Sequence, residues 1–496
     1  MTLQYQSTRN QNNRVTASQA VLQGLAVDGG LYVPTQIPKI DLDFDLLAKL
    51  SYQELALKLL HPFFDDYTKE ELTHCINSAY DTKFDTEEIA PLKKVGNEYF
   101  LELFHGSTIA FKDMALSILP YLMTTAAKKN KVDNEIVILT ATSGDTGKAA
   151  MAGFADVPGT SIIVFYPKDG VSKIQERQMT TQEGANTHVV AIEGNFDSAQ
   201  TNVKKMFNNS KLREKLLGHH KQFSSANSMN IGRLFPQVVY YIYAYVQLVK
   251  QAEIKSGDTI NFSVPTGNFG NILAAYYAKQ LGLPINKLIC ASNENHVLTD
   301  FFNSGTYDKN RDFFVTSSPS MDILISSNLE RLIFHLSGDD DQKTTDLMHD
   351  LETKGVYQLT DTMKANLQDF AAEFATQVET SAQIAETFKN HHYIVDPHTA
   401  VAENVYHKYQ QQTADNTPTV IVSTASAYKF PRIVVEAING KAQIDDPELV
   451  DVLHQLSDIP LPNAVQGLFT AEVRHKTVVH ENQMQEIVET ILNLES

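Results

Sequence analysis

Cysteine is scarce in this chain, with only Cys75 and Cys290 among 496 residues. Two cysteines cannot form a disulfide framework, which argues against a small secreted fold held together by disulfides. Cys75 lies on the apolar face of a predicted helix, and Cys290 lies within an apolar run. We interpret both as buried thiols in a reducing compartment and assign neither a catalytic role.

Long apolar runs are also missing. No segment approaches the roughly 18 consecutive apolar residues that a membrane-spanning helix needs. Residues 1–14 lack the apolar core of a signal peptide. We therefore expect a cytoplasmic protein without a membrane partner.

Basic residues are outnumbered, since 41 lysines and arginines face 59 aspartates and glutamates, a net charge of −18. Such a surface repels nucleic acid and anionic lipid, so neither is expected as a partner. A small anionic substrate is not excluded, because helix N-termini and a few lysines can make one site locally positive. The acidic run at residues 338–342 is interpreted as a solvated loop, and no metal site is predicted.

Strand-like and helix-like segments alternate from about residue 95 onward. The candidate strands are apolar on both faces, which is typical of parallel strands covered by helices. The first ninety residues are predicted to be mainly helical, with capping boxes that begin at Ser51 and Thr68. The sequence therefore predicts an α/β protein. The candidate strands lie at residues 135–140, 161–165, 187–192, 259–264 and 419–423.

Lys112 stands between a phenylalanine and an aspartate in the segment FHGSTIAFKDMA, residues 104–115. A lysine held in an apolar pocket loses its proton more readily and can form an imine with an aldehyde cofactor. Taken alone, this segment is also compatible with a solvated lysine, which is the more common situation.

A second segment, LTATSGDTGK at residues 139–148, predicts a strand, a tight turn and the start of a helix. The N–H groups and hydroxyls of such a turn can hold a carboxylate. An ordinary turn with Asp145 or Thr146 as the helix cap explains the segment equally well.

A third segment, SVPTGNFGNIL at residues 263–273, predicts a strand, a loop and a helix. Gly267 and Gly270 allow the backbone to approach a ligand closely, and a helix start favours a dianion, so we interpret the loop as a phosphate cradle. The absence of a following Gly-Lys-Ser/Thr argues against a P-loop. The glycine spacing argues against a dinucleotide site.

A fourth segment, VSTASAYKF at residues 422–430, ends a buried strand in clustered hydroxyls. Ligands bind beyond the carboxyl ends of strands in open α/β sheets. A strand end with hydroxyl caps and no ligand is at least as good an interpretation of this segment alone.

Together the four segments resemble the threonine synthase family, which belongs to the fold type II pyridoxal-phosphate (PLP) enzymes. The order and spacing of HGSTIAFKD, SGDTG and GNFGN carry this resemblance. The overall length and the N-terminal region resemble the longer subtype found in many bacteria and fungi. Three further segments match the family, at residues 24–34, 227–233 and 395–401.

The resemblance implies a role for individual residues. Lys112 matches the lysine that forms the Schiff base with PLP, and Thr424, next to Ser423, matches the hydroxyl that faces the pyridine nitrogen. The loop implied to hold the cofactor phosphate is Gly267, Asn268, Phe269, Gly270 and Asn271. The implied substrate-binding residues are Ser143, Gly144, Asp145 and Thr146 at the carboxylate, with Lys148, Asn230 and Arg233 as candidates at the substrate phosphate.

The sequence departs from the family pattern at two places. Ser107 stands where the family usually has proline, which loosens the turn before Lys112 but removes no reacting group. After Thr424, Ala-Ser-Ala-Tyr replaces the commoner Ala-His-Pro-Ala, so the resemblance does not define the contacts around Ser426 and Tyr428.

The resemblance also implies an architecture and a reaction. A mainly helical region (residues 1–90) precedes a large cofactor-binding domain (91–119 and 231–496) and a small substrate-closing domain (120–230), both α/β with parallel sheets. The implied reaction converts O-phospho-L-homoserine and water to L-threonine and phosphate, the last step of threonine biosynthesis. The alternatives are a related fold type II lyase or dehydratase and a non-catalytic PLP-binding protein. A monomer and a homodimer are both compatible with the resemblance.

Overall fold

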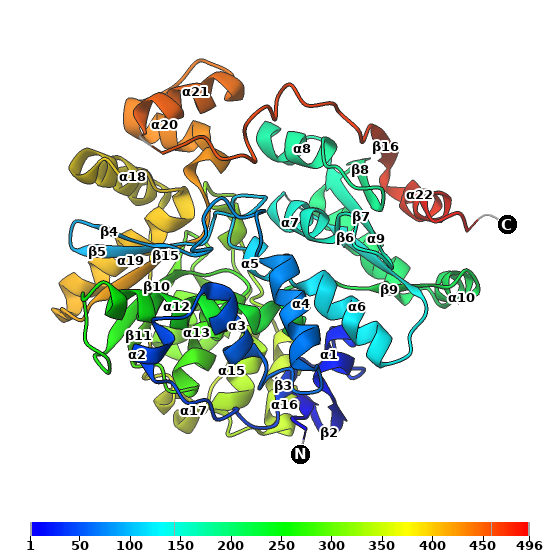
Figure 1. The fold of residues 1–496 in the computed structure, drawn as a ribbon, viewed down its shortest axis with the longest axis horizontal. Helices are drawn as coiled ribbons and strands as arrows, with labels where there is room; N and C mark the ends of the chain where they lie inside the picture. The colour runs from blue at the N-terminus through cyan, green and yellow to red at the C-terminus, as the bar shows by residue number, and fades with distance from the viewer. Residues whose placement is uncertain (1, 143, 458, 495–496) are drawn as a thin grey trace.

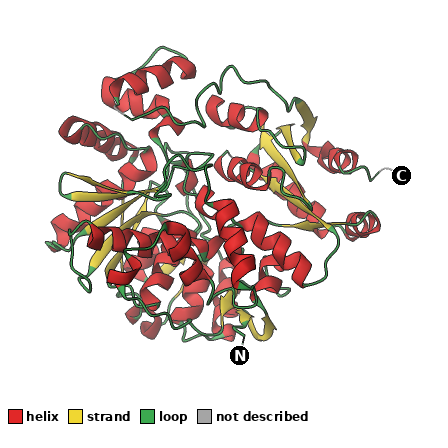
Figure 2. Ribbon diagram, in the orientation of Figure 1, coloured by secondary structure: helices red, strands yellow, loops and turns green. Residues whose placement is uncertain are grey.

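The computed structural model describes residues 2–142, 144–457 and 459–494. Two groups of strands lie apart in the molecule, and helices and loops fill the space between and around them (Figures 1 and 2). The N-terminal region packs below both groups in the view of Figure 1. The predicted α/β class is thus confirmed.

The N-terminal region is mainly helical, as predicted, and it also contains a three-stranded antiparallel sheet with the order β2-β1-β3. Both predicted capping boxes are confirmed. Ser51 and Thr68 each accept a hydrogen bond from the backbone of a glutamate three residues on, and that glutamate accepts one from the cap N–H. The elements of this region are β1 (Tyr5–Ser7), β2 (Asn10–Val15), α1 (Ala17–Gln23), β3 (Tyr32–Pro34), α2 (Phe44–Leu47), α3 (Tyr52–Leu60) and α4 (Lys69–Ala79).

The larger sheet has six strands in the order β14-β11-β10-β15-β5-β4. All neighbours are parallel except β4, which pairs antiparallel with β5 at the edge. Its strands are β4 (Leu92–Val95), β5 (Glu98–Glu102), β10 (Ile260–Pro265), β11 (Ile285–Ser292), β14 (Phe370–Phe374) and β15 (Thr419–Ser423).

Alternate residues of these strands enter two different hydrophobic cores. Val420 and Val422 of β15 pack in one core with α12 (Pro236–Lys250) and α13 (Gly270–Gln280). Ile421, between them, packs in the other core with α19 (Pro397–Thr413). Helices therefore cover both faces of the sheet, which explains why the strand sequences are apolar without alternation.

The smaller sheet has five parallel strands in the order β16-β8-β7-β6-β9. Its edge strand β16 comes from the C-terminal part of the chain, which the predicted boundaries assign to the large domain. The boundaries themselves stay a prediction. The elements here are β6 (Glu135–Ala141), α7 (Asp145–Phe154), β7 (Thr160–Pro167), α8 (Lys173–Thr180), β8 (Thr187–Glu193), α9 (Phe196–Asn208), α10 (Ser210–Gly218), β9 (Lys221–Ser224), β16 (Thr477–His480) and α22 (Met484–Ile491).

The remaining elements connect or cover the two sheets. They are α5 (Asp113–Leu116), α6 (Leu119–Lys129), α11 (Ile231–Leu234), α14 (Val297–Ser304), β12 (Thr306–Asp308), η1 (Pro319–Met321), α15 (Leu329–Leu336), α16 (Asp341–Thr353), β13 (Val356–Gln358), α17 (Asp361–Ala365), α18 (Gln377–His391), η2 (Ala427–Lys429), α20 (Pro431–Asn439), α21 (Asp446–Leu456) and η3 (Glu481–Gln483). No helix within the described residues combines the length and the hydropathy needed to cross a lipid bilayer.

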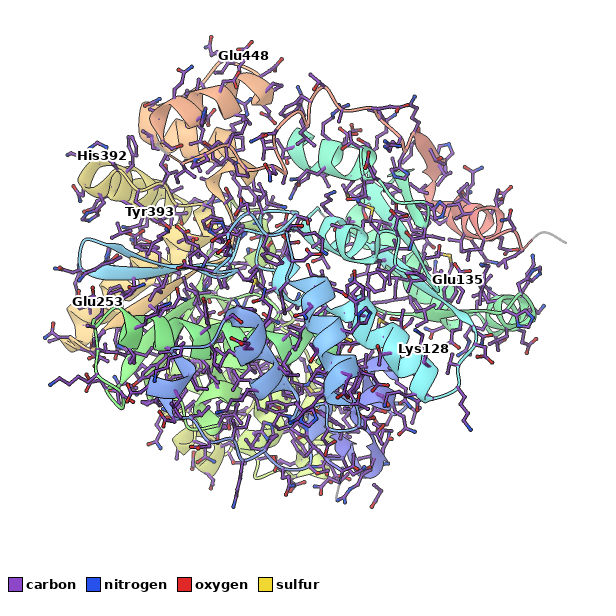
Figure 3. All side chains as sticks on the ribbon, viewed as in Figure 1. Lys128, Glu135, Glu253, His392, Tyr393 and Glu448 are labelled. Carbon is purple, nitrogen blue, oxygen red and sulfur yellow. The ribbon has the colours of Figure 1, made fainter. Side chains whose placement is uncertain are left out.

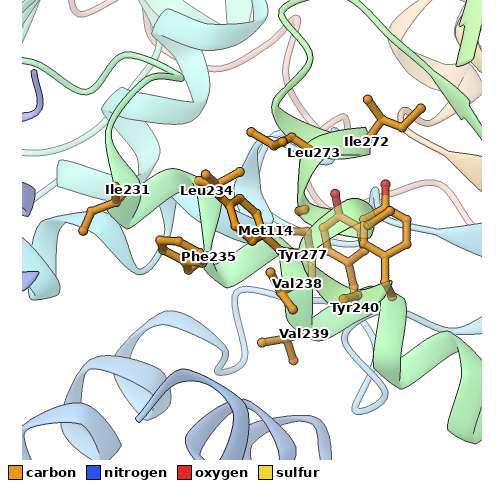
Figure 4. Close-up of a cluster of buried hydrophobic side chains, with 14 of the residues drawn as sticks. Met114, Ile231, Leu234, Phe235, Val238, Val239, Tyr240, Ile272, Leu273 and Tyr277 are labelled. Atoms are coloured by element: carbon orange, nitrogen blue, oxygen red, sulfur yellow. The ribbon is translucent and has the colours of Figure 1, made fainter. Parts of the chain in front are cut away.

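One buried cluster joins the helices that follow three of the predicted site segments (Figure 4). Helix α5 follows Lys112, α11 carries Arg233, and α13 follows the predicted phosphate cradle. Because close-packed side chains hold these helices together, Lys112, Arg233 and the predicted phosphate cradle have fixed relative positions. The cluster includes Met114, Ile231, Leu234, Phe235, Val238, Val239, Tyr240, Ile272, Leu273 and Tyr277.

Candidate functional site

Lys112 lies immediately before α5, and its side chain is only 13% exposed. Its Nζ donates a hydrogen bond to Ser320 Oγ at 3.1 Å and lies 4.0 Å from Asp145 Oδ2. Burial lowers the pKa of Lys112 to about 8, although the nearby Asp145 carboxylate acts in the opposite direction. The solvated-lysine alternative is therefore excluded, and an amine that loses its proton easily is a suitable nucleophile for an aldehyde.

The turn before Lys112 is held by Asp113, which is 2% exposed. Its carboxylate accepts hydrogen bonds from the backbone N–H and the hydroxyl of Thr108, at 2.8 and 2.6 Å. Gly106 lies against the same carboxylate, since a Cβ added there would be 2.6 Å from it. These contacts fix the turn even though Ser107 replaces the proline common in the family.

The loop of residues 267–271 lies at the start of α13 and has the features of an anion cradle. None of its backbone N–H groups has an acceptor among the described residues. Its carbonyl groups are bonded elsewhere, because Gly267 O accepts from Ser326 Oγ at 2.7 Å and Asn268 O accepts from the N–H of Asn328 at 3.0 Å. Phe269 has a left-handed backbone with φ of 65°. The free N–H groups and the helix dipole together favour a phosphate.

The loop before α7 is organised differently. Ser143 lies outside the described residues. The N–H groups of Gly144 and Gly147 both donate to Thr142 Oγ1 at 3.0 Å. Asp145 is the first residue of α7.

Asp145 connects this loop with three other segments. Its Oδ1 accepts from Gln175 Nε2 at 2.8 Å and lies 3.2 Å from Lys429 Nζ, and its Oδ2 accepts from Ser320 Oγ at 2.9 Å. Burial alone would raise the pKa of Asp145, but Lys429 and Lys112 outweigh burial and hold it below its ordinary value. The loop therefore contacts Ser320 and Lys429, which lie far along the chain, through an ionised carboxylate.

Buried cations outnumber buried anions around Lys112. Burial lowers the pKa of Lys148 to about 7 and that of Arg233 to about 10, and the Lys429 side chain has no exposed surface. Arg233 donates through Nη1 to Ala226 O at 2.9 Å, yet its buried Nε has no partner among the described residues. Unpaired buried charge is costly, so this arrangement calls for anionic ligands.

Asn230 and Thr424 differ in how much of their hydrogen-bonding capacity is already used. Asn230 donates to Val21 O at 2.8 Å and accepts from the N–H of Gly232 at 2.9 Å, so a ligand would have to displace one of these bonds. Thr424 is 4% exposed, and its hydroxyl has no hydrogen bond with the described residues. The hydroxyl of Ser423, by contrast, pairs with Thr399 Oγ1 at 2.9 Å. Thr424 is thus the available hydroxyl at this strand end.

Four further residues at the site were not identified from the sequence. Lys429 and His398 lie within segments that the sequence analysis singled out, but neither received a role there. His398 Nε2 accepts from the N–H of Ser320 at 3.2 Å, and its Nδ1 contacts Asp396 Oδ2 at 2.6 Å. Ser320 and Gln175 carry no local sequence signal, because only the tertiary structure brings them to Asp145.

Comparison with known proteins agrees with this geometry. Three family models match in order: Threonine synthase N terminus at residues 4–80, Pyridoxal-phosphate dependent enzyme at residues 86–425, and Threonine synthase, C-terminal at residues 399–491. Threonine synthase of Schizosaccharomyces pombe is 36% identical over 468 residues, which cover 88% of this chain and 89% of that protein. The chain belongs to the threonine synthase family.

A solved structure and a longer relative complete the comparison. The crystal structure of PLP-bound threonine synthase from Brucella melitensis matches with a TM-score of 0.88 at 35% identity, covering 99% of each chain. Threonine synthase-like 1 from Homo sapiens is 42% identical over 439 residues, or 86% of this chain, but the match spans only 58% of that protein's length. The predicted fold type II architecture is confirmed, and the cofactor of this family member is PLP.

The residues present fit this cofactor. Its phosphate matches the free N–H groups of residues 267–271, and its aldehyde requires an amine such as that of Lys112. Gly267 in particular must remain small, because a Cβ added there would lie 2.5 Å from Ser320 O.

Proposed function

We propose that this chain is a threonine synthase that converts O-phospho-L-homoserine and water to L-threonine and phosphate. The observation that carries the proposal is the concentration of buried cations and free N–H groups around Lys112, which suits a phosphorylated cofactor together with a phosphorylated amino acid. Family membership and full-length similarity to threonine synthases support the same reaction.

In this proposal the cofactor is held by Lys112, Thr424 and the loop of residues 267–271. When bound, PLP supplies an electron-withdrawing ring that stabilises the negative charge developing on substrate carbon. Thr424, whose hydroxyl is unused among the described residues, would offer a neutral partner to the ring nitrogen. A neutral partner would leave this nitrogen largely unprotonated, which would reduce the electron withdrawal and favour controlled proton transfer over transamination.

Lys112 Nζ is the proposed base. It removes the proton from Cα of the substrate and assists removal of one proton from Cβ, while phosphate leaves from Cγ. The two protons are then returned to Cγ and Cα, the hydroxyl of a water adds at Cβ, and the remaining water proton goes to the released phosphate. The pKa of about 8 allows the amine to release and accept protons near neutral pH. Ser320 Oγ orients Nζ by accepting its hydrogen bond, and Asp145 Oδ2 orients it through the opposite charge 4.0 Å away.

The substrate is proposed to bind between the two sheets. Residues 143–146 would hold the carboxylate through backbone N–H groups and hydroxyls, which requires the loop to exchange some of its present bonds. Lys148, Arg233 and Asn230 are proposed at the substrate phosphate. Arg233 is the best placed of these, because its Nε lacks a partner among the described residues.

The deciding experiment is incubation of the PLP-loaded protein with O-phospho-L-homoserine, followed by amino-acid analysis and a phosphate assay. Equal amounts of threonine and phosphate are expected. A keto acid as the product would favour the related lyase or dehydratase, and no phosphate release would favour a non-catalytic PLP-binding protein.

Location and assembly are also proposals. A cytoplasmic location is supported by the two buried cysteines, and the net charge of −18 argues against nucleic-acid partners. A monomer or a homodimer fits the family, and size-exclusion chromatography with light scattering distinguishes them.

A further inference from the structure

Three potential metal ligands converge at a place that the proposed reaction does not use. Glu98 begins β5, and Glu403 and His407 lie one helical turn apart on the same face of α19. One ligand atom from each residue lies within 4.8 Å of those of the other two.

This cluster is remote from Lys112. Along β5, Glu98 lies at the opposite end from Glu102, which pairs with Ser423 next to the proposed cofactor site. Along α19, His407 lies nine residues beyond His398, about 14 Å at the rise of an α-helix. The cluster is therefore a separate feature and not part of the site around Lys112.

Glu403 is the unusual member of the cluster. It is 2% exposed, and its Oε1 accepts a hydrogen bond from Thr387 Oγ1 at 2.7 Å. Its buried Oε2 has no hydrogen-bond partner among the described residues. The side chain of Gln383 lies nearby, and its amide donates to Thr387 at 3.2 Å.

Neither protonation state of Glu403 satisfies this oxygen. An ionised carboxylate leaves buried negative charge uncompensated, and a protonated one leaves an O–H group without an acceptor. A cation next to Oε2 would satisfy the oxygen and remove the repulsion between the two carboxylates.

The other two ligands leave a path to solvent. The side chains of His407 and Glu98 are 33% and 19% exposed, and His407 Nε2 lies 2.5 Å from Glu98 Oε1. These two side chains therefore form the side of the cluster through which an ion can enter.

We propose that Glu98, Glu403 and His407 bind one divalent transition-metal ion, with Zn²⁺ as the best match. Two carboxylates and a neutral imidazole carry two negative charges, and Zn²⁺ takes oxygen and imidazole ligands at about 2.0–2.2 Å. Imidazole is a poor ligand for Mg²⁺ and Ca²⁺, which prefer oxygen alone. The close contact between His407 and Glu98 must open by roughly 1 Å to admit the ion between them, and water completes the tetrahedral coordination.

An ion at this place has a structural role. It fixes the start of β5 to α19, two segments that are about 300 residues apart in the chain. Tyr393, labelled in Figure 3, lies between α18 and α19 and donates to Glu102 at 2.8 Å, which ties the same strand to this helix pair from its other end. The inference replaces the sequence-based expectation that the protein has no metal site.

The test uses the PLP-loaded protein, dialysed against a chelator, freed of unbound PLP and titrated with Zn²⁺ by calorimetry. One ion per chain and a rise in the thermal unfolding midpoint are expected. Co²⁺ serves as a spectroscopic probe, because four-coordinate Co²⁺ with nitrogen and oxygen ligands gives intense visible bands that surface-bound, six-coordinate Co²⁺ does not.

Variants locate the ion. Glu403→Gln preserves shape and removes the unpaired oxygen's charge, and we expect the affinity to fall at least about 100-fold. Glu98→Gln, at a partly exposed strand start, gives the same result if Glu403→Gln fails to fold. His480→Asn is the matched control, because His480 forms a similar pair with Glu193 at 2.9 Å on an exposed surface and should leave the binding unchanged. Absence of stoichiometric binding to the parent protein, or equal binding to Glu98→Gln and the parent, overturns the proposal.

Discussion

The loop of residues 267–271 and the loop around Gly144 both lie against Ser320, the hydrogen-bond partner of Lys112, but they are bonded in opposite ways. In the first loop the N–H groups have no acceptor among the described residues, while the carbonyl groups of Gly267 and Asn268 are held by Ser326 and Asn328. In the second loop the N–H groups of Gly144 and Gly147 are already bonded to Thr142. The first is ready to accept an anion without rearrangement.

This difference matches the two kinds of ligand that the proposed function needs. A cofactor that stays bound is best served by a preformed cradle, because no conformational change has to be repeated in each turnover. A substrate that enters and leaves requires a loop whose bonds can be exchanged, and Asp145 supplies such bonds to Lys429, Ser320 and Gln175. The comparison can be tested at the residues that hold each loop.

Replacement of Lys112, which lies between the loops, should have the largest effect. Lys112→Ala removes the amine that holds the cofactor and moves the protons, so we expect turnover to fall at least about 10³-fold. The absorbance of the lysine-bound cofactor should disappear. Lys112→Arg retains the positive charge but cannot form the imine, and should fail equally; substantial activity in either variant would contradict the assignment.

Replacement of Lys429 should break the contact that holds the second loop. Lys429→Met leaves the buried Asp145 carboxylate without its closest cation, a loss of about 3–5 kcal/mol for a buried pair. We expect the thermal unfolding midpoint to fall by roughly 3–5 °C. The double variant with Asp145→Asn should recover part of this loss.

Lys408→Met is the matched control for this prediction. Lys408 pairs with Glu379 at 2.8 Å, but both side chains are partly exposed, so the pair contributes less than about 1 kcal/mol. If both lysine variants lower the midpoint equally, the loop is not held by the Asp145–Lys429 contact.

The two loops also differ in how far the sequence predicted them. The cradle was predicted from its own residues, because a strand, GNFGN and a helix are local features, and the helix begins at Gly270. The partners of Asp145 were not, since Lys429 and Ser320 lie far along the chain and only tertiary packing brings them together.

The fold shows the same limit. Strands that are apolar on both faces were recognised from the sequence, since helices cover both faces of the sheet. The pairing of β16 with β8 was not, because the strand contains four residues that are mostly exposed and follows its partner by nearly 300 positions. The short strands β1 and β2 likewise carry polar residues that give no apolar pattern.

The rigidity of the cradle can be tested at Gly267. In Gly267→Ala the new Cβ would lie 2.5 Å from the backbone oxygen of Ser320, which cannot rotate away. Overpacking of this kind costs about 1–3 kcal/mol, so PLP affinity should fall roughly 10- to 100-fold in a fluorescence titration. Gly270→Ala should lose less, because its nearest neighbouring atom is 3.6 Å away. Gly218→Ala, where nothing lies within 4 Å, serves as the control.

The smallest expected effect is a pH dependence of the free energy of unfolding. It arises from the buried Lys148 in α7, the helix that follows the second loop, and not from the cradle. Burial lowers the pKa of Lys148 to about 7 in the folded protein, whereas an unfolded lysine titrates near 10.4. Between these values the unfolded chain binds more protons, so this residue makes the protein more stable as the pH rises, by up to about 1.4 kcal/mol per pH unit. The stability of the PLP-free protein relative to Lys148→Met should therefore increase from pH 7 to pH 9 in thermal unfolding. The exposed Lys255→Met variant should show no such trend, and a flat difference for Lys148→Met would mean that this side chain is hydrated.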